Sequence, residues 1–162
     1  FYGEHCLSVE RRLAYEETIR IPLIVRYPPL IRAGSQFDPY VLSIDLAPTL
    51  LELGGAKAPS NLHGRSLLPL VRGEAYEART SFLVELFSDA VFPRVKNMGY
   101  QAVRTERWKY IHYVDLDGCD ELYDLQVDPY ELVNLVGDAS VAGKLRELKA
   151  ELSRLVGEGS GK

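Results

Sequence analysis

The chain has few cysteines and no long hydrophobic run. Its 162 residues include two cysteines, Cys6 and Cys119, which are far apart and match no metal-binding or redox spacing. We therefore interpret them as isolated thiols rather than a structural disulfide. A membrane-spanning helix needs roughly 20 consecutive apolar residues, and neither such a run nor a signal-peptide pattern is present. The sequence thus predicts no membrane partner.

An excess of charge of one sign is also lacking. The chain has 19 basic and 23 acidic residues, a formal net charge of -4, and both signs are spread along its length. A nucleic-acid partner is therefore excluded, because such proteins present concentrated positive charge. No N-x-S/T acceptor occurs, which fits a bacterial source. Any targeting segment would lie upstream of residue 1, so localisation stays open between the periplasm and the cytoplasm of a bacterium.

The first half of the chain predicts one buried strand and two helices. Residues 21–27 form a short apolar run closed by Pro28 and Pro29, which indicates a strand buried on both faces in a parallel sheet. Apolar residues in 43–53 recur at helical spacing before two glycines, and a shorter helix over 66–71 closes at Gly73.

The second half predicts a small antiparallel sheet covered by a helix. Residues 82–87, 102–105, 109–114 and 121–125 are strand candidates separated by short turn signals. A final helix, which we expect to end at Gly157, carries one apolar stripe that should cover one face of the sheet. Its members are Val141, Leu145, Leu148, Leu152 and Leu155.

Arg11 is the strongest candidate for chemistry, because a guanidinium offers a charged fork of donors that matches two oxygens of sulfate or phosphate. The spacing alone favours the other interpretation, in which Arg11 and Arg12 are a solvated pair beside glutamates. His5 could donate to an anion or to a leaving-group oxygen, although a lone histidine is more often structural. His63 and His112 have no acidic or thiol partner at ligand spacing, so no metal site is expected within the chain.

Several motifs occur in an order that resembles the C-terminal region of the sulfatase family, in the alkaline phosphatase superfamily. The resemblance covers nearly the whole chain. It rests on G-E-H at residues 3–5, Arg11 four residues before Tyr15, I-D-L-A-P-T-L at 44–50, G-R-S-L-L-P at 64–69, and A-V-R-T-E-R-W-K-Y-I, E-L-Y-D-L and D-P-Y-E-L-V-N-L in the second half. The first half then reads as an incomplete catalytic α/β domain (residues 1–80). The second half (residues 81–162) reads as its antiparallel sheet-plus-helix subdomain.

The resemblance also implies roles for individual residues. Arg11 stands where sulfatases place an anion-binding lysine, and would neutralise the sulfate oxygens as charge develops on the leaving group. His5 would act beside it. The segment 87–100 is loop-like and cationic, and we hypothesise that Arg94 and Lys96 lie at the pocket rim and help to select the substrate.

The resemblance further implies a formylglycine nucleophile, made from a cysteine in a C-x-P/A-x-R motif, and a divalent cation, commonly calcium. Neither cysteine of this chain lies in that motif, and the acidic metal ligands that precede G-E-H are absent. We therefore expect both to be supplied by residues upstream and the isolated chain to be inactive. The expected partner of the whole enzyme is a sulfate ester, with sulfated carbohydrate as the commonest choice, and the isolated chain is expected to self-associate.

Two alternatives remain open. The same region occurs in phosphodiesterases and phosphonate monoester hydrolases of the superfamily, which differ from sulfatases upstream of Phe1. A non-catalytic module that binds a partner subunit is the other alternative. It would be favoured by monomeric folding without exposed apolar surface.

Overall fold

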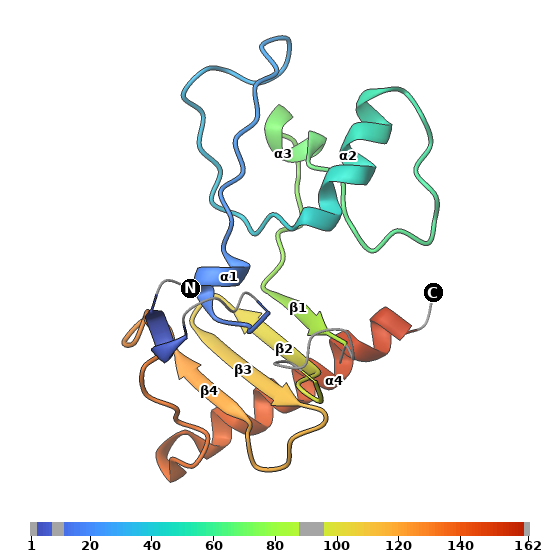
Figure 1. The fold of residues 1–162 in the computed structure, drawn as a ribbon. Coiled ribbons are helices and arrows are strands. Elements are labelled where there is room, and N and C mark those ends of the chain that lie inside the picture. The colour runs from blue at the N-terminus through green and yellow to red at the C-terminus, as the bar shows by residue number, and fades with distance from the viewer. Residues whose placement is uncertain (1–2, 8–11, 88–95, 161–162) are drawn as a thin grey trace. The chain divides into compact units, whose positions relative to one another are not determined.

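The computed structural model describes residues 3–7, 12–87 and 96–160 (Figure 1). The chain divides into two compact units, one made of Phe1–Pro22 with Ser81–Gly161 and the other of Leu23–Thr80. We call them the sheet unit and the helical unit. Within the described residues, no helix has the length and apolar character that crossing a membrane requires. The predicted division of the enzyme at residue 80 stays a prediction.

The sheet unit contains one four-stranded antiparallel sheet. Its strands are β1 (Ser81–Leu86), β2 (Tyr100–Thr105), β3 (Trp108–Tyr113) and β4 (Glu121–Asp124), paired in sequence order. The register pairs Ala102 with Ile111 and Tyr110 with Leu122. The predicted sheet is thus confirmed, with strand ends within two residues of those expected, because short apolar runs joined by tight turns determine a local meander.

The two faces of the sheet bury different partners. Because side chains alternate along a strand, Val103, Tyr110 and Leu122 share the face that packs on Leu148 and Leu152 of α4 (Ala142–Ser160). The opposite face buries residues of the N-terminal segment, which includes α1 (Glu16–Ile19) and passes in front of the sheet in Figure 1. This second cluster, which we call the tyrosine face, consists of Leu13, Ala14, Tyr15, Tyr100, Ala102, Ile111, Tyr113 and Tyr123.

Helix α4 begins after a short 3₁₀ turn, Ala139–Val141, and it continues through Gly157 to Ser160. The expected end at Gly157 is therefore wrong. One glycine costs a helix only about 1 kcal/mol relative to alanine. Here Arg154 pairs with Glu158 at 2.5 Å, one helical turn on, and so joins the residues on either side of Gly157.

The helical unit is organised around the buried carboxylate of Asp45. A 3₁₀ turn, Ser43–Asp45, leads into α2 (Leu46–Leu53), and α3 (Leu68–Arg72) follows. Asp45 is fully buried, and its carboxylate accepts hydrogen bonds from both terminal guanidinium nitrogens of Arg79, at 2.8 and 2.6 Å. It also accepts the backbone N–H groups of Leu42 and Arg65, each at 2.8 Å. One side chain therefore fixes three parts of the unit.

The apolar run at residues 21–27 does not form the expected buried strand. It has no strand assignment in the structure, and Ile21 and Ile24 are 68% and 91% exposed. A parallel strand needs neighbours on its edges, and the sheet of the described residues pairs only β1 to β4. The prediction of a buried strand is therefore wrong, because the described residues provide no strand partner for the run.

Replacing Asp45 with alanine should lower the free energy of unfolding of the helical unit by about 3–5 kcal/mol, because Arg79 is left buried without its partner. Hydrogen exchange of the α2 amides would measure the loss. Glu52→Ala is the matched control, since Glu52 and Arg72 are both about 40% exposed and 3.5 Å apart, and it should cost less than about 1 kcal/mol. Equal losses in the two variants would contradict the prediction.

Candidate functional site

His5 lies on a strained turn and is covered by an aromatic ring. It belongs to the 3₁₀ turn Glu4–Cys6, where His5 and Cys6 have φ angles of 53° and 59°. Its imidazole stacks on the phenol ring of Tyr15, with the ring centroids 3.9 Å apart and the planes inclined by 6°. Its Nε2 lies 3.4 Å from Oε2 of Glu17. The imidazole is thus held between an aromatic face and a carboxylate.

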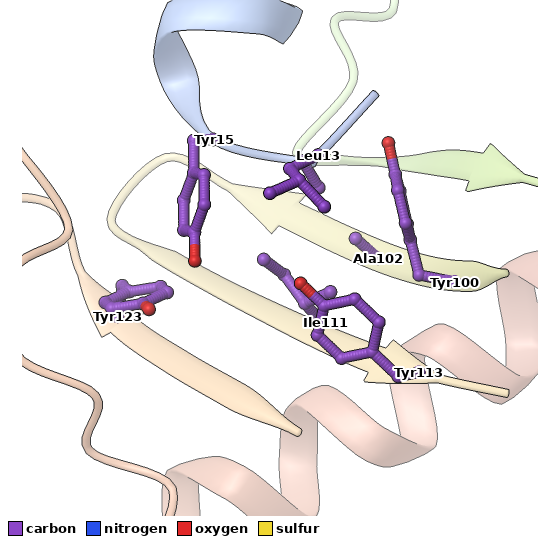
Figure 2. Close-up of a cluster of buried hydrophobic side chains, with 8 residues drawn as sticks. Leu13, Tyr15, Tyr100, Ala102, Ile111, Tyr113 and Tyr123 are labelled. Atoms are coloured by element: carbon purple, nitrogen blue, oxygen red, sulfur yellow. The ribbon is translucent and has the colours of Figure 1, made fainter. Parts of the chain in front are cut away.

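Tyr15 is in turn attached to the sheet through Glu121. The hydroxyl groups of Tyr15 and Tyr113 donate to Oε1 of Glu121, at 3.2 and 3.1 Å, and that of Tyr123 donates to Oε2 at 2.8 Å. Figure 2 shows Tyr15 reaching from the N-terminal segment toward the strands that carry Tyr113 and Tyr123. Burial, and then Glu121, raise the pKa of all three phenols, so they remain neutral donors.

A buried ion-pair cluster fixes the backbone next to Tyr15. Lys109 is fully buried, and its Nζ donates to the carbonyl of Ala14 at 2.8 Å. The same Nζ lies 2.6 Å from Glu131 and 2.9 Å from Glu16. Glu131 also accepts the backbone N–H of Glu16 at 2.7 Å, and Nε of Arg104 pairs with Glu16 at 3.0 Å. Three distant parts of the sequence therefore meet at one buried charge.

Lys109 and Arg104 offset the burial of Glu16, whereas burial outweighs Lys109 at Glu131 and raises the pKa of that carboxyl group. Burial alone would raise the pKa of Glu16, but hydrogen bonds from Arg104 and the charge of Lys109 outweigh it and hold that pKa below its ordinary value. Glu16 is thus a carboxylate at neutral pH. The cluster forms an anchor that fixes the segment following the His5 turn.

The structure describes two of the four predicted site residues. Arg11 and Arg94 lie outside the described residues. Lys96 is exposed, in a turn that precedes β2. Leu7, two residues after His5, and Met98, two residues after Lys96, both pack on the tyrosine face. The structure therefore brings both segments to the same face of the sheet.

Sequence reasoning missed the functional setting of Tyr15 and Lys109. Both were seen only as parts of architectural motifs. A signal was available for Lys109, because it alternates with Ile111 and Tyr113 along β3, and residues two apart on a strand share a face. No pattern in a single sequence indicates that Tyr15 stacks on His5.

The described residues provide no ligand set for a metal. No group of three or more His, Cys, Asp or Glu side chains among them is arranged to hold an ion. Cys6 and Cys119 are both exposed and unpaired with each other, as expected. His112 lies 2.9 Å from Asp120 on the sheet and His63 is exposed. Among the described residues there is thus no ligand set for the cation that the resemblance implies, and neither cysteine lies in the motif that yields formylglycine.

The comparison with known proteins decides the family. Residues 3–158 match the family of N-sulphoglucosamine sulphohydrolase C-terminal regions. This chain belongs to that family. The predicted resemblance to a sulfatase C-terminal region is thereby confirmed.

Individual relatives agree with this assignment. An N-acetylglucosamine-6-O-sulfatase of Bacteroides thetaiotaomicron is 36% identical over 150 residues, which cover 91% of this chain and 26% of the relative. A solved structure of a protein bound to its substrate, D-glucosamine-2-N,6-O-disulfate, has a TM-score of 0.84 and 34% identity, with 95% of this chain and 31% of that chain covered. The chain therefore spans between a quarter and a third of these relatives.

The superfamily assignment is supported by a phosphonate monoester hydrolase of Agrobacterium radiobacter. Its structure has a TM-score of 0.69 and 29% identity, with 78% of this chain and 27% of that chain covered. The expected fold, a sulfatase-type fragment with a four-stranded sheet and a C-terminal helix, agrees with these structures.

Replacing Lys109 with methionine should lower the free energy of unfolding of the sheet unit by about 3–5 kcal/mol at neutral pH, because Glu131 stays buried without its cation. The loss should shrink as the pH falls. Glu16 has a lowered pKa in the folded state, so its stabilising contribution is present above its unfolded pKa and disappears as the pH drops through the folded one. Urea denaturation at several pH values between 7 and 4 would measure the loss of stability at neutral pH and its decrease as the pH falls.

The matched control for that experiment is Lys144→Met. Lys144 pairs with Glu147 on the exposed surface of α4, and such pairs contribute less than about 1 kcal/mol. A Lys109→Met variant as stable as Lys144→Met would contradict the prediction.

Proposed function

We propose that this chain is the C-terminal part of a sulfatase that hydrolyses the sulfate ester of a sulfated glucosamine. One observation carries the proposal. The 6-O-sulfatase relative and the structure bound to a glucosamine disulfate each cover more than nine-tenths of this chain. The substrates of both relatives are sulfated glucosamines, and the shared region supports the same substrate class here.

Arg11 and His5 carry the proposed chemistry of this chain. The guanidinium of Arg11 binds sulfate oxygens and stabilises the charge that develops as the ester bond breaks. His5 donates a proton to the leaving oxygen. The nucleophile and the cation belong to residues upstream, so the chain alone is expected to give no turnover.

Arg94 and Lys96 are proposed to select the substrate. The support is that the segments after His5 and after Lys96 both pack on the tyrosine face, through Leu7 and Met98. Two cations near an anion site would favour substrates that carry a second sulfate or a carboxylate.

The alternative of a non-catalytic module is less supported. A module of that kind is expected to have a surface without large apolar patches. In this chain, apolar residues of the run at 21–27 and Leu50 of α2 are exposed. The phosphonate monoester hydrolase alternative rests on a structure with lower identity and coverage than the sulfated-sugar relatives.

The complete product of the gene should hydrolyse N-acetylglucosamine 6-sulfate and release sulfate, and the isolated chain should not. The coding sequence upstream of residue 1 is expected to contain a C-x-P/A-x-R motif. Release of sulfate by ion chromatography and assay of a phosphonate monoester would check the reaction. A start codon directly before Phe1, or turnover of the phosphonate alone, would overturn the proposal.

Within that enzyme, Arg11→Ala should lower kcat/KM at least about 100-fold, because it removes a charge that stabilises the transition state. Arg11→Lys should restore a large part of the activity, since it keeps the charge but not the fork of donors. Arg12→Ala is the neighbouring control and should change kcat/KM little. Equal effects of Arg11→Ala and Arg12→Ala would contradict the role of Arg11.

A further inference from the structure

We propose that Tyr15 is the positioning residue of His5 and that Glu121 anchors Tyr15. This inference rests on the proposed function, because it concerns the histidine of that site. Tyr15 acts through His5 and does not itself touch the substrate.

The first step is the geometry of the stack. The imidazole of His5 and the phenol of Tyr15 are nearly parallel, with centroids 3.9 Å apart. Both nitrogens of an imidazole lie in the ring plane, so a partner on the ring face fixes the plane and leaves the edges able to form hydrogen bonds. Glu17, 3.4 Å from Nε2, then restricts rotation within the plane.

The second step is that the turn needs an external support. His5 and Cys6 both have φ near +55°, and a non-glycine residue held there costs of order 1–3 kcal/mol. The turn is closed by its own backbone, through Gly3 N–H to the carbonyl of Leu7 at 3.0 Å. A strained conformation persists only when its surroundings hold it, and Tyr15 covers the face of the His5 ring.

The third step is that Tyr15 is itself immobile. Its hydroxyl donates to Glu121, and the backbone is fixed on both sides of it. The carbonyl of Ala14 accepts from Lys109, and the N–H of Glu16 donates to Glu131. Tyr15 is thus held by its ring hydroxyl and by the backbone of both neighbouring residues, so its ring can support the imidazole of His5.

The chain itself allows a test that does not depend on turnover. The ring protons of His5 should resonate upfield of those of the exposed His63 because of the ring current of Tyr15, and nuclear Overhauser contacts should join the two rings. Tyr15→Leu should abolish the upfield shift, whereas Tyr15→Phe should reduce it only in part, because the ring and the two backbone anchors remain while the bond to Glu121 is lost. Tyr113→Leu is the matched control, since it also removes a buried phenol bonded to Glu121 but not the stack on His5.

The complete enzyme provides the second readout. Tyr15→Leu should lower kcat by about 100-fold with little change in KM, because a misplaced proton donor affects the reacting step. Tyr15→Phe should recover most of kcat, and Tyr113→Leu should stay within a few-fold of wild type below its melting temperature.

Equal loss of the His5 shift or of kcat in Tyr15→Leu and Tyr113→Leu would overturn the proposal, because both variants would then act only through stability. Absence of ring-to-ring contacts in the wild-type chain would overturn it as well, even if Tyr15→Leu does not fold. A complete enzyme without sulfatase activity would refute the proposed function instead, and the wild-type spectrum would still decide whether Tyr15 holds His5.

Discussion

The sheet unit depends on the buried charge of Lys109. An ammonium group with no solvent exposure must be paired, since an isolated buried charge is far more costly than a lost contact. Its three partners, Ala14, Glu16 and Glu131, come from parts of the sequence more than 100 residues apart. Such a cluster adds little net stability over an apolar core of the same size, but it tolerates few arrangements. The geometry of the N-terminal segment on the sheet follows from that requirement.

Because Lys109 must be paired, the two faces of the sheet are held by different kinds of contact. The face under α4 is held by apolar contacts such as those of Val103 and Leu148, which tolerate small shifts. The tyrosine face instead combines apolar packing with directed hydrogen bonds to Glu121 and from Lys109, which require particular distances and angles. The segment that carries His5 is attached to the second face. The segment that carries the proposed proton donor is thus attached to the sheet by contacts of defined distance and angle.

The sequence predicts the sheet and α4 well because their signals are local. Alternation along the strands, short turns and the apolar stripe of α4 each involve a few neighbouring residues. The strand at residues 21–27 was wrong because its signal, a continuous apolar run, implies neighbours that the described chain does not contain. Lys109 was missed because a lysine between apolar residues is ordinarily solvent-facing, and Tyr15 because its contact with His5 depends on a turn that no pattern encodes. Arg11 and Arg94 remain predictions.

The proposed binding of a sulfate near His5 meets an electrostatic difficulty, because several carboxylates hold Tyr15 beside it. Glu16, Glu121 and Glu131 all lie within the contacts that hold Tyr15, and unpaired carboxylates there would repel a sulfate. Glu16 and Glu131 face Lys109, and Arg104 adds a second cation to Glu16. Glu121 has no cation among these partners, but three phenols donate to it and disperse its charge. The carboxylates that hold Tyr15 can therefore order the segment after His5 while cations or phenol donors face each of them.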